Sequence, residues 1–386
     1  MAESILVYTF TALILYWLAR NLSMRESYIS NGITQTQTKF WSPEIFFTII
    51  IFATISGARY NVGVDHLYYL SEYISLQTSG LTRRETFEPG FMLMFRSFAR
   101  SGFHYFYFFA LFAAMQLFFI YYTLKDRKFL LPYVALSIML GPYFLNWMNG
   151  MRQCLAMCMF VFLVEYIIER KFWKFAIGIL IAATMHKSAI VLFPLYFILF
   201  KEPKFFNRII NLTILFACVA IGTTPTWTKI ILNAQSLLST LGYDFYAENI
   251  ELLLEEGMRR ISWGPSRIGL FLIDVFIIWY FPKMKAFYSK DKYISFYFIL
   301  LLIGAFLYNL FVNTSHIFLR PIEYFTIFRL PLSAYLLYYL KSTGKKYIFS
   351  TLCIIIFSYI YFIIIKSVLI PSPASDCNLY KFFFQF

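Results

Sequence analysis

The sequence predicts an all-α, polytopic membrane protein with about twelve transmembrane helices. Of its 386 residues, 60% are apolar and only 14% are charged, and the mean hydropathy is +0.64; such values do not describe a soluble domain. A transmembrane helix needs about 20 mostly apolar residues. The expected spans, several of them shorter than this, are 4–19, 43–58, 103–124, 129–147, 152–168, 172–185, 187–200, 209–222, 266–281, 293–312, 323–340 and 347–366.

Basic turns between these segments predict the orientation of the chain. Because cytoplasmic loops of membrane proteins carry an excess of lysine and arginine, we place these turns in the cytoplasm and both termini outside. The chain is then a single integral membrane domain, residues 1–386, whose long outward loops 59–102 and 223–265 form the site. The basic turns are 125–128, 169–171, 201–208, 283–292 and 341–346.

Arginines dominate the positive charge on the predicted outer side. Topology does not distinguish lysine from arginine, whereas the planar guanidinium suits bidentate binding of phosphate or carboxylate. The outer face is therefore predicted to bind an anion; the alternative is that the arginines pair with nearby carboxylates or reach lipid headgroups. The eleven outward arginines are Arg59, Arg83, Arg84, Arg96, Arg100, Arg152, Arg259, Arg260, Arg267, Arg320 and Arg329.

The charge and the cysteines argue against other classes of partner. The formal charge of +14 needs no nucleic acid, because cytoplasmic lysines facing anionic membrane lipid account for much of it. The five cysteines form no metal-binding pattern with histidine. We therefore expect no zinc or other metal, no cofactor and no disulfide framework.

A compact polar motif opens the loop that follows the second expected span. Arg59 follows a small-residue helix end, and Gly63 allows a tight turn before Asp65. Asp65 is a candidate base for a hydroxyl or an orienting partner of Arg59; equally, the two form only a salt bridge that closes the loop. Tyr69 offers an aromatic surface for a sugar ring, although such a tyrosine is also typical of a membrane-interface belt.

The rest of this loop contains a Glu-Pro-Gly-Phe element and a short amphipathic stretch. Glu88 begins the element, and Arg96 lies one helical turn before Arg100 in the stretch, which we expect to be an interfacial or re-entrant helix. The other long loop, 223–265, has acidic and leucine-rich turns. We interpret it as a lid over an outer cavity.

Two polar breaks mark later spans. Arg152 begins a predicted span, where the amides of a helix N-terminus favour phosphate, and Gln153 adds a donor. Arginine there opposes the helix dipole unless an anion binds, which favours a functional role over that of a plain helix residue. His186 and Lys187 interrupt the apolar run 172–200; we interpret His186 as a buried proton carrier, with a hydrogen-bonded structural role as the alternative.

Two more arginines flank the start of the eleventh expected span. Arg320 and Arg329 are candidate ligands of the same anion, and Glu323 neutralises one of them in the simpler interpretation. The predicted substrate-binding residues are therefore Arg59, Arg96, Arg152, Gln153, Lys187, Arg320, Arg329 and Tyr69.

In their order and spacing, these motifs resemble the EpsG family of Wzy-type bacterial polysaccharide polymerases. The resemblance covers most of the chain. It comprises an arginine followed by Gly-x-Asp and tyrosine, the Glu-Pro-Gly-Phe element, Asn-x-x-Arg-Gln followed by Leu-Ala, His-x-Ser-Ala with a later proline, and an arginine near a Tyr-Phe pair. The residues that carry it are Arg59, Gly63, Asp65 and Tyr69; Glu88 to Phe91; Asn149, Arg152, Gln153, Leu155 and Ala156; His186, Ser188, Ala189 and Pro194; and Arg320, Tyr324 and Phe325.

The resemblance implies a multi-pass enzyme of the bacterial cytoplasmic (inner) membrane, with a fold similar to GT-C-like helical glycosyltransferases. Such an enzyme joins oligosaccharide repeat units carried on undecaprenyl diphosphate at the extracytoplasmic face, near a chain-length regulator of the polysaccharide copolymerase type. Arginines are expected to stabilise the leaving diphosphate, and a carboxylate or histidine to take the proton of the attacking hydroxyl, without metal. The catalytic candidates are Arg152, Asp65, Glu88 and His186, and the arginines that assist Arg152 are Arg59, Arg320 and Arg96.

Two other functions fit a cationic outer face. A flippase or other transporter of the lipid-linked oligosaccharide also has a cationic cavity, but inverted repeats, a frequent signature of transporters, are not visible by eye. An O-antigen-ligase-like glycosyltransferase shares the chemistry and differs in its acceptor. We therefore expect a polymerase and keep these two functions as alternatives.

Overall fold

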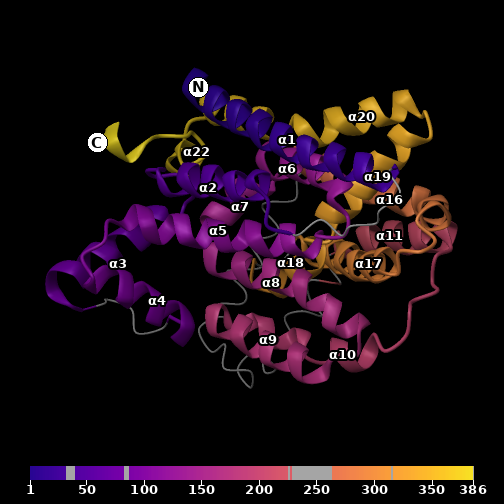
Figure 1. Ribbon diagram of the computed structural model, residues 1–386, viewed down its shortest axis with the longest axis horizontal. Helices are drawn as coiled ribbons and strands as arrows, with labels where there is room; N and C mark the ends of the chain where they lie inside the picture. Colours follow the sequence, from indigo (N-terminus) through magenta and orange to yellow (C-terminus); the bar gives the residue numbers. More distant parts are fainter. Residues whose placement is uncertain (32–39, 82–86, 225–226, 228–262, 314–315, 386) are drawn as a thin grey trace. The chain divides into compact units, whose positions relative to one another are not determined.

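The structure is a computed structural model, and it describes residues 1–31, 40–81, 87–224, 227, 263–313 and 316–385. Helices dominate these ranges (Figure 1), and the extended backbone there pairs only at an isolated bridge between Arg59 and Phe382. The all-α class is thereby confirmed. The helices are α1 (Ala2–Asn31), α2 (Pro43–Gly57), α3 (His66–Ser79), α4 (Pro89–Arg100), α5 (Tyr105–Thr123), η1 (Lys128–Leu130), α6 (Leu131–Leu140), α7 (Tyr143–Asn149), α8 (Met151–Ile168), α9 (Phe172–Met185), η2 (Lys187–Leu192), α10 (Leu195–Ile198), α11 (Arg208–Gly222), α16 (Pro265–Phe287), α17 (Tyr293–Phe311), α18 (His316–Thr326), α19 (Arg329–Ser342), α20 (Lys346–Phe357), α21 (Tyr359–Leu369), α22 (Pro373–Asp376) and η3 (Phe383–Gln385).

Four of the described helices are long and apolar enough to cross a membrane: α1, α5, α8 and α17. The number rises to six if α6 with α7, bent by 60°, and α20 with α21, bent by 41°, each count as one span. All twelve expected segments overlap a helix, but four of the apolar helices have only 10–17 residues. The structure therefore supports a helical, multi-span membrane protein, and twelve spans stay a prediction.

The chain divides into two compact units, which we describe separately. The first consists of residues 1–200 and 333–386, and the second of residues 201–332. The expected lid, 223–265, lies outside the described residues apart from Trp227 and its two ends. Its role, and the expectation of a single domain, stay predictions.

In the first unit, α5 and α8 form the centre. α2 lies between α1 and α5 and packs on both (Figure 1), while α8 packs on α5 and α9. Apolar side chains of α5, such as Phe108 and Leu117, are fully buried. Buried Gln116 of α5 donates to the main-chain carbonyls of Trp147 at 3.5 Å and Met151 at 3.2 Å. These bonds tie α5 to the end of α7 and to the start of α8.

A bend between α6 and α8 sets the position of the candidate site. Gly141 and Pro142 separate α6 from α7, and Gly150 separates α7 from α8 with a non-helical backbone (φ −84°, ψ 46°). We call this second interruption the α7–α8 break. It places Arg152 in the first turn of α8 and presents Asn149 to the loop that follows α2.

The second unit is a bundle in which α17 packs on α11 and α18, and α16 packs on α11. Asn313, just after α17, joins two of these elements. Its side-chain amide donates to the carbonyl of Gly222 at 3.0 Å, and its oxygen accepts from Arg267 of α16 at 3.1 Å. A polar side chain thus ties the ends of the helices together at this point.

Candidate active site

Arg152 is the centre of a cluster that draws on four segments of the chain. Its Nε donates a hydrogen bond to the Tyr69 hydroxyl of α3 at 3.1 Å, and its Nη1 forms an ion pair with Glu88 Oε2. The other carboxylate oxygen of Glu88 accepts from the main-chain N–H of Lys187 at 3.2 Å. Four residues that the sequence analysis took from separate motifs therefore meet at one place.

Aromatic rings surround the Arg152 guanidinium. Its Cζ atom lies 4.8 Å from the centre of the Phe87 ring, 5.4 Å from that of Phe91 and 6.0 Å from that of Tyr69. The side chain of Arg152 is 19% exposed, so it is largely but not completely shielded from solvent. A partly desolvated cation over aromatic faces interacts with an anion more strongly than a fully hydrated one.

The start of α4 holds Glu88 in place. Pro89 takes the first helical position, where its missing N–H does no harm. Gly90 brings this turn against the end of α9, because a Cβ at Gly90 would lie only 2.7 Å from Thr184 Cβ and 2.8 Å from Met185 Cε. The Glu-Pro-Gly-Phe element therefore carries the Glu88 carboxylate to the end of α9.

His186 lies between the end of α9 and Lys187. It is buried, its backbone is extended, and its Nδ1 shares a hydrogen bond of 2.6 Å with Ser188 Oγ. Lys187 is an exposed residue. The hydrogen-bonded role that the sequence left open for His186 is thus present, and its role as a proton carrier stays a prediction.

Arg59 is 1% exposed and donates to main-chain carbonyls. Its Nε donates to Val62 O at 3.2 Å, its Nη1 to Ser56 O, and its Nη2 to Met148 O at 3.3 Å. Burial lowers the pKa of Arg59 to about 10, so it stays charged at neutral pH. Its guanidinium thus ties the loop to the α7–α8 break, and no ion pair with Asp65 is seen among the described residues.

Gly63 and Asp65 complete the contact between this loop and the α7–α8 break. Gly63 has a φ of 91°, and a Cβ there would lie 3.0 Å from Met148 O and 3.1 Å from Asn149 N. Both the backbone angle and the space favour glycine. Asp65, an exposed residue, donates its main-chain N–H to Asn149 Oδ1 at 3.0 Å. The first motif therefore binds the Asn-x-x-Arg motif three residues before Arg152.

His66 and Phe87 are not among the predicted site residues. Phe87 nevertheless packs against Arg152, and His66 packs on Phe109, the ring that also contacts Arg59. His66 is fully buried, its ring centre is 5.0 Å from that of Phe109, and neither ring nitrogen has a partner among the described residues. Burial, assisted by the charge of Arg59, lowers the pKa of His66 to about 2. Phe87 precedes Glu88, the N-cap of α4, and is one aromatic residue among many, so no signal in the sequence marked it; for His66 the only signal is that it adjoins Asp65.

The contacts of Arg152 described above involve none of the remaining predicted ligands. Arg96 is exposed on α4, and Gln153 is buried in α8. In the second unit, Arg320 is exposed on α18, whereas buried Arg329 pairs with Asp274 of α16 through two hydrogen bonds of 2.7 and 2.8 Å. Roles for these residues in binding a diphosphate stay predictions.

A comparison with known protein families shows which family the chain belongs to. The model of the EpsG family matches residues 44–382. The chain belongs to the EpsG family. All the residues that carried the resemblance fall in the matched range of this EpsG-family protein, and the family is one of Wzy-type polymerases. No curated protein and no solved structure matches the chain. This EpsG-family protein is thus a membrane protein of the polysaccharide-polymerase type.

Proposed function

We propose that this EpsG-family protein joins oligosaccharide repeat units carried on undecaprenyl diphosphate, at the extracytoplasmic face of the cytoplasmic membrane. The observation that carries the proposal is the Arg152 cluster. The Arg152 side chain is partly exposed, lies in the first turn of a helix, and is held by Tyr69 and Glu88. A fixed guanidinium at a helix N-terminus is suited to bind phosphate oxygens.

In this proposal, Glu88 is the counterion of Arg152 until the donor diphosphate binds. A carboxylate and a diphosphate compete for the same guanidinium, so the diphosphate displaces Glu88 Oε2 while the Lys187 N–H still holds Oε1. Arg152 is neutralised in both states, which avoids an unpaired cation in a partly dry site. The displaced carboxylate is then a base beside the diphosphate.

The reaction breaks one bond and forms another at the anomeric carbon of the growing glycan. A hydroxyl oxygen at the nonreducing end of the next repeat unit attacks this carbon, and the bond from the carbon to the diphosphate oxygen breaks. Undecaprenyl diphosphate leaves with the electron pair, its charge stabilised by Arg152. The base takes the hydroxyl proton and later releases it to water. We favour Glu88 as this base because it contacts Arg152; Asp65 and His186 are the alternatives.

The wider architecture belongs to the same proposal. Twelve transmembrane helices in a GT-C-like arrangement, with the site on the outer side and a chain-length regulator as partner, are supported by the helices found in all twelve expected segments and by membership of the family. Arg59 acts in this proposal by placing the loop after α2, and Arg152 by direct contact with the diphosphate.

The test is a polymerisation assay with purified protein and its lipid-linked repeat unit, in detergent and with EDTA. We expect a ladder of products from the wild type, none from Arg152→Ala, and a weak one from Arg152→Lys, since lysine lacks the planar fork. Arg100→Ala, at an exposed arginine of α4, is the matched control and should keep the ladder.

Two outcomes would contradict the proposal in different ways. If folded wild-type protein binds the substrate but forms no ladder, a flippase or a ligase becomes the better assignment. If Arg152→Ala forms a normal ladder, the polymerase assignment stands and Arg152 has no part in the reaction.

A further inference from the structure

Residues 376–383, which we call the tail segment, run along the loop that carries Arg59 and Gly63. Three main-chain hydrogen bonds of 2.8 to 2.9 Å join the two segments, and Arg59 forms the isolated antiparallel bridge with Phe382. The tail segment thus contacts a loop more than 300 positions away in sequence. The bonded atoms are Tyr60 N with Lys381 O, Gly63 N with Cys377 O, and Phe383 N with Ala58 O.

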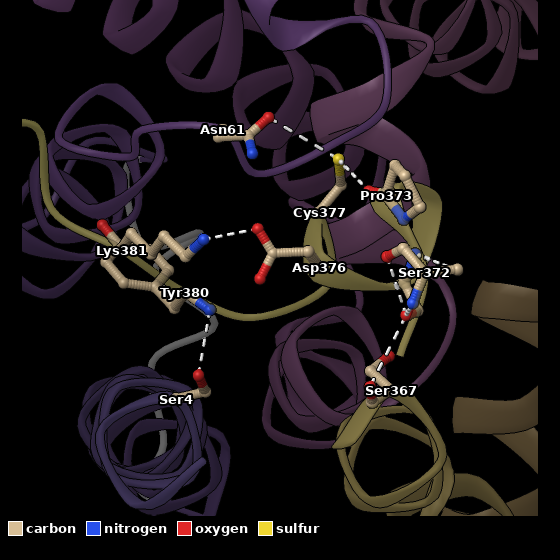
Figure 2. A network of polar contacts seen from close by, with 10 residues as sticks. Ser4, Asn61, Ser367, Ser372, Pro373, Asp376, Cys377, Tyr380 and Lys381 are labelled. Atoms are coloured by element: carbon tan, nitrogen blue, oxygen red, sulfur yellow. Dashed lines mark hydrogen bonds and ion pairs between the residues drawn. The ribbon is translucent and has the colours of Figure 1, made fainter. Parts of the chain in front are cut away.

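The tail segment is itself anchored on two helices. The Tyr380 main-chain N–H donates to Ser4 Oγ of α1 at 3.0 Å (Figure 2). The Tyr380 hydroxyl donates to the carbonyl of Ile55 in α2 at 2.7 Å. Tyr380 is only 2% exposed. Figure 2 also shows Cys377 facing the side chain of Asn61 in the loop, at an Sγ to Oδ1 distance of 3.6 Å.

The contacts continue from the loop to the start of α8. Arg59 donates to Met148 O and Asp65 donates to Asn149 Oδ1, both at the α7–α8 break. Arg152 lies in the next turn. A displacement of the loop would therefore shift the start of α8 and, with it, the Arg152 side chain.

We propose that the tail segment is a positioning element of the candidate active site, with Tyr380 as its principal positioning residue. It holds the loop of Arg59 against the α7–α8 break, and the break sets the direction of Arg152. The inference rests on the proposed function, because it gives the tail segment a part in the reaction assigned to Arg152. A misplacement of about 1 Å at a reacting group reduces rates by as much as about 100-fold.

Two variants remove the anchors of Tyr380 one at a time. Tyr380→Phe removes the hydrogen bond to Ile55, and Ser4→Ala removes the acceptor of the Tyr380 N–H. Tyr361→Phe is the matched control, because it removes a tyrosine hydroxyl hydrogen bond of 2.8 Å, to Thr9 of α1, from a residue of α21 that lies outside the tail segment.

Three measurements on detergent-solubilised full-length protein separate positioning from plain stabilisation. They are amide hydrogen exchange over residues 58–65, the midpoint of thermal unfolding, and kcat and KM for ladder formation. We expect Tyr380→Phe and Ser4→Ala to exchange faster at Tyr60 and Gly63 and to lose roughly tenfold in kcat, with little change in KM. Their unfolding midpoints should match that of Tyr361→Phe, which keeps its kcat.

Faster exchange with a wild-type kcat, unchanged exchange, or a loss of activity that follows the loss of stability overturns the inference while the polymerase assignment stands. If the wild type forms no ladder, the proposed function fails and the inference fails with it. If Tyr380→Phe does not fold, Ser4→Ala decides by the same measurements.

Discussion

The Nη2 atom of Arg59 donates a hydrogen bond of 3.3 Å to the carbonyl of Met148, 89 positions along the chain. The bond joins the loop after α2 to the α7–α8 break. An arginine that opens the first family motif therefore holds backbone in this structure, although arginines of the outer side were expected to bind an anion. The nearby Arg152, by contrast, is partly exposed and has a carboxylate partner that an anion can displace.

Replacing Arg59 by methionine should destabilise the protein. The substitution keeps most of the stem but leaves the carbonyls of Ser56, Val62 and Met148 without their donor, at a cost of about 3 kcal/mol. Arg152→Met, at a partly exposed residue, should lower the free energy of unfolding less and abolish polymerisation. Urea unfolding followed by tryptophan fluorescence measures the free energy of unfolding of both variants, and the ladder assay measures polymerisation. An Arg59→Met protein as stable as wild type that no longer binds a prenyl diphosphate would make Arg59 a ligand instead.

Gly63→Ala should disturb the loop more than the same change at Gly80. Both glycines have a positive φ, so each substitution carries a backbone penalty of about 1 kcal/mol. At Gly80 a Cβ meets nothing within 4 Å, whereas at Gly63 it presses on the backbone of Met148 and Asn149. We expect Gly63→Ala to show the lower unfolding midpoint and a lower kcat. Equal midpoints and equal activities would mean that the loop adjusts without moving α8.

Much of the helical architecture follows from the apolar runs. The sequence predicts one span over 129–147, but Gly141 and Pro142 bend it by 60° between α6 and α7. It also predicts a span over 187–200. There the structure has a 3₁₀ helix before the turn at Pro194 and four α-helical residues after it. Proline removes a donor and restricts its neighbours, so it breaks helices that hydropathy alone describes as continuous.

The site follows from the sequence only in part. Polar residues stand out in an apolar chain, so Glu88 and Arg152 were both predicted, but as a base and an anion ligand in separate motifs. Their ion pair across 64 positions depends on how α4 packs against α9. Phe87 and the tail segment offer no such contrast, because one more aromatic residue is not informative in a chain with 22% aromatic residues. Only the fold brings the tail segment to the loop and Phe87 to Arg152.

Glu88→Gln tests the base. The substitution keeps the size of the side chain and an oxygen for the Lys187 N–H but removes the proton acceptor, so kcat should fall by about 100-fold or more. Glu165→Gln is the matched control: it removes an ion pair with Lys125 at the other end of α8 and should keep the ladder. Multiple-turnover assays with saturating substrate give kcat for each variant. A Glu88→Gln protein with a wild-type kcat would leave Asp65 or His186 as the base.

His66 should make the stability of the protein depend on pH. Its pKa is about 2 in the folded protein against 6.5 for an ordinary histidine, so between these values the unfolded chain binds a proton that the folded chain does not. The free energy of unfolding contributed by His66 is therefore constant above about pH 6.5 and falls below it, by about 1.4 kcal/mol per pH unit. His66→Phe, which suits a position among aromatic rings, should remove this part of the dependence. Unfolding midpoints of both proteins, measured from about pH 7 to pH 5, check it, because equally steep curves would assign the dependence to other groups.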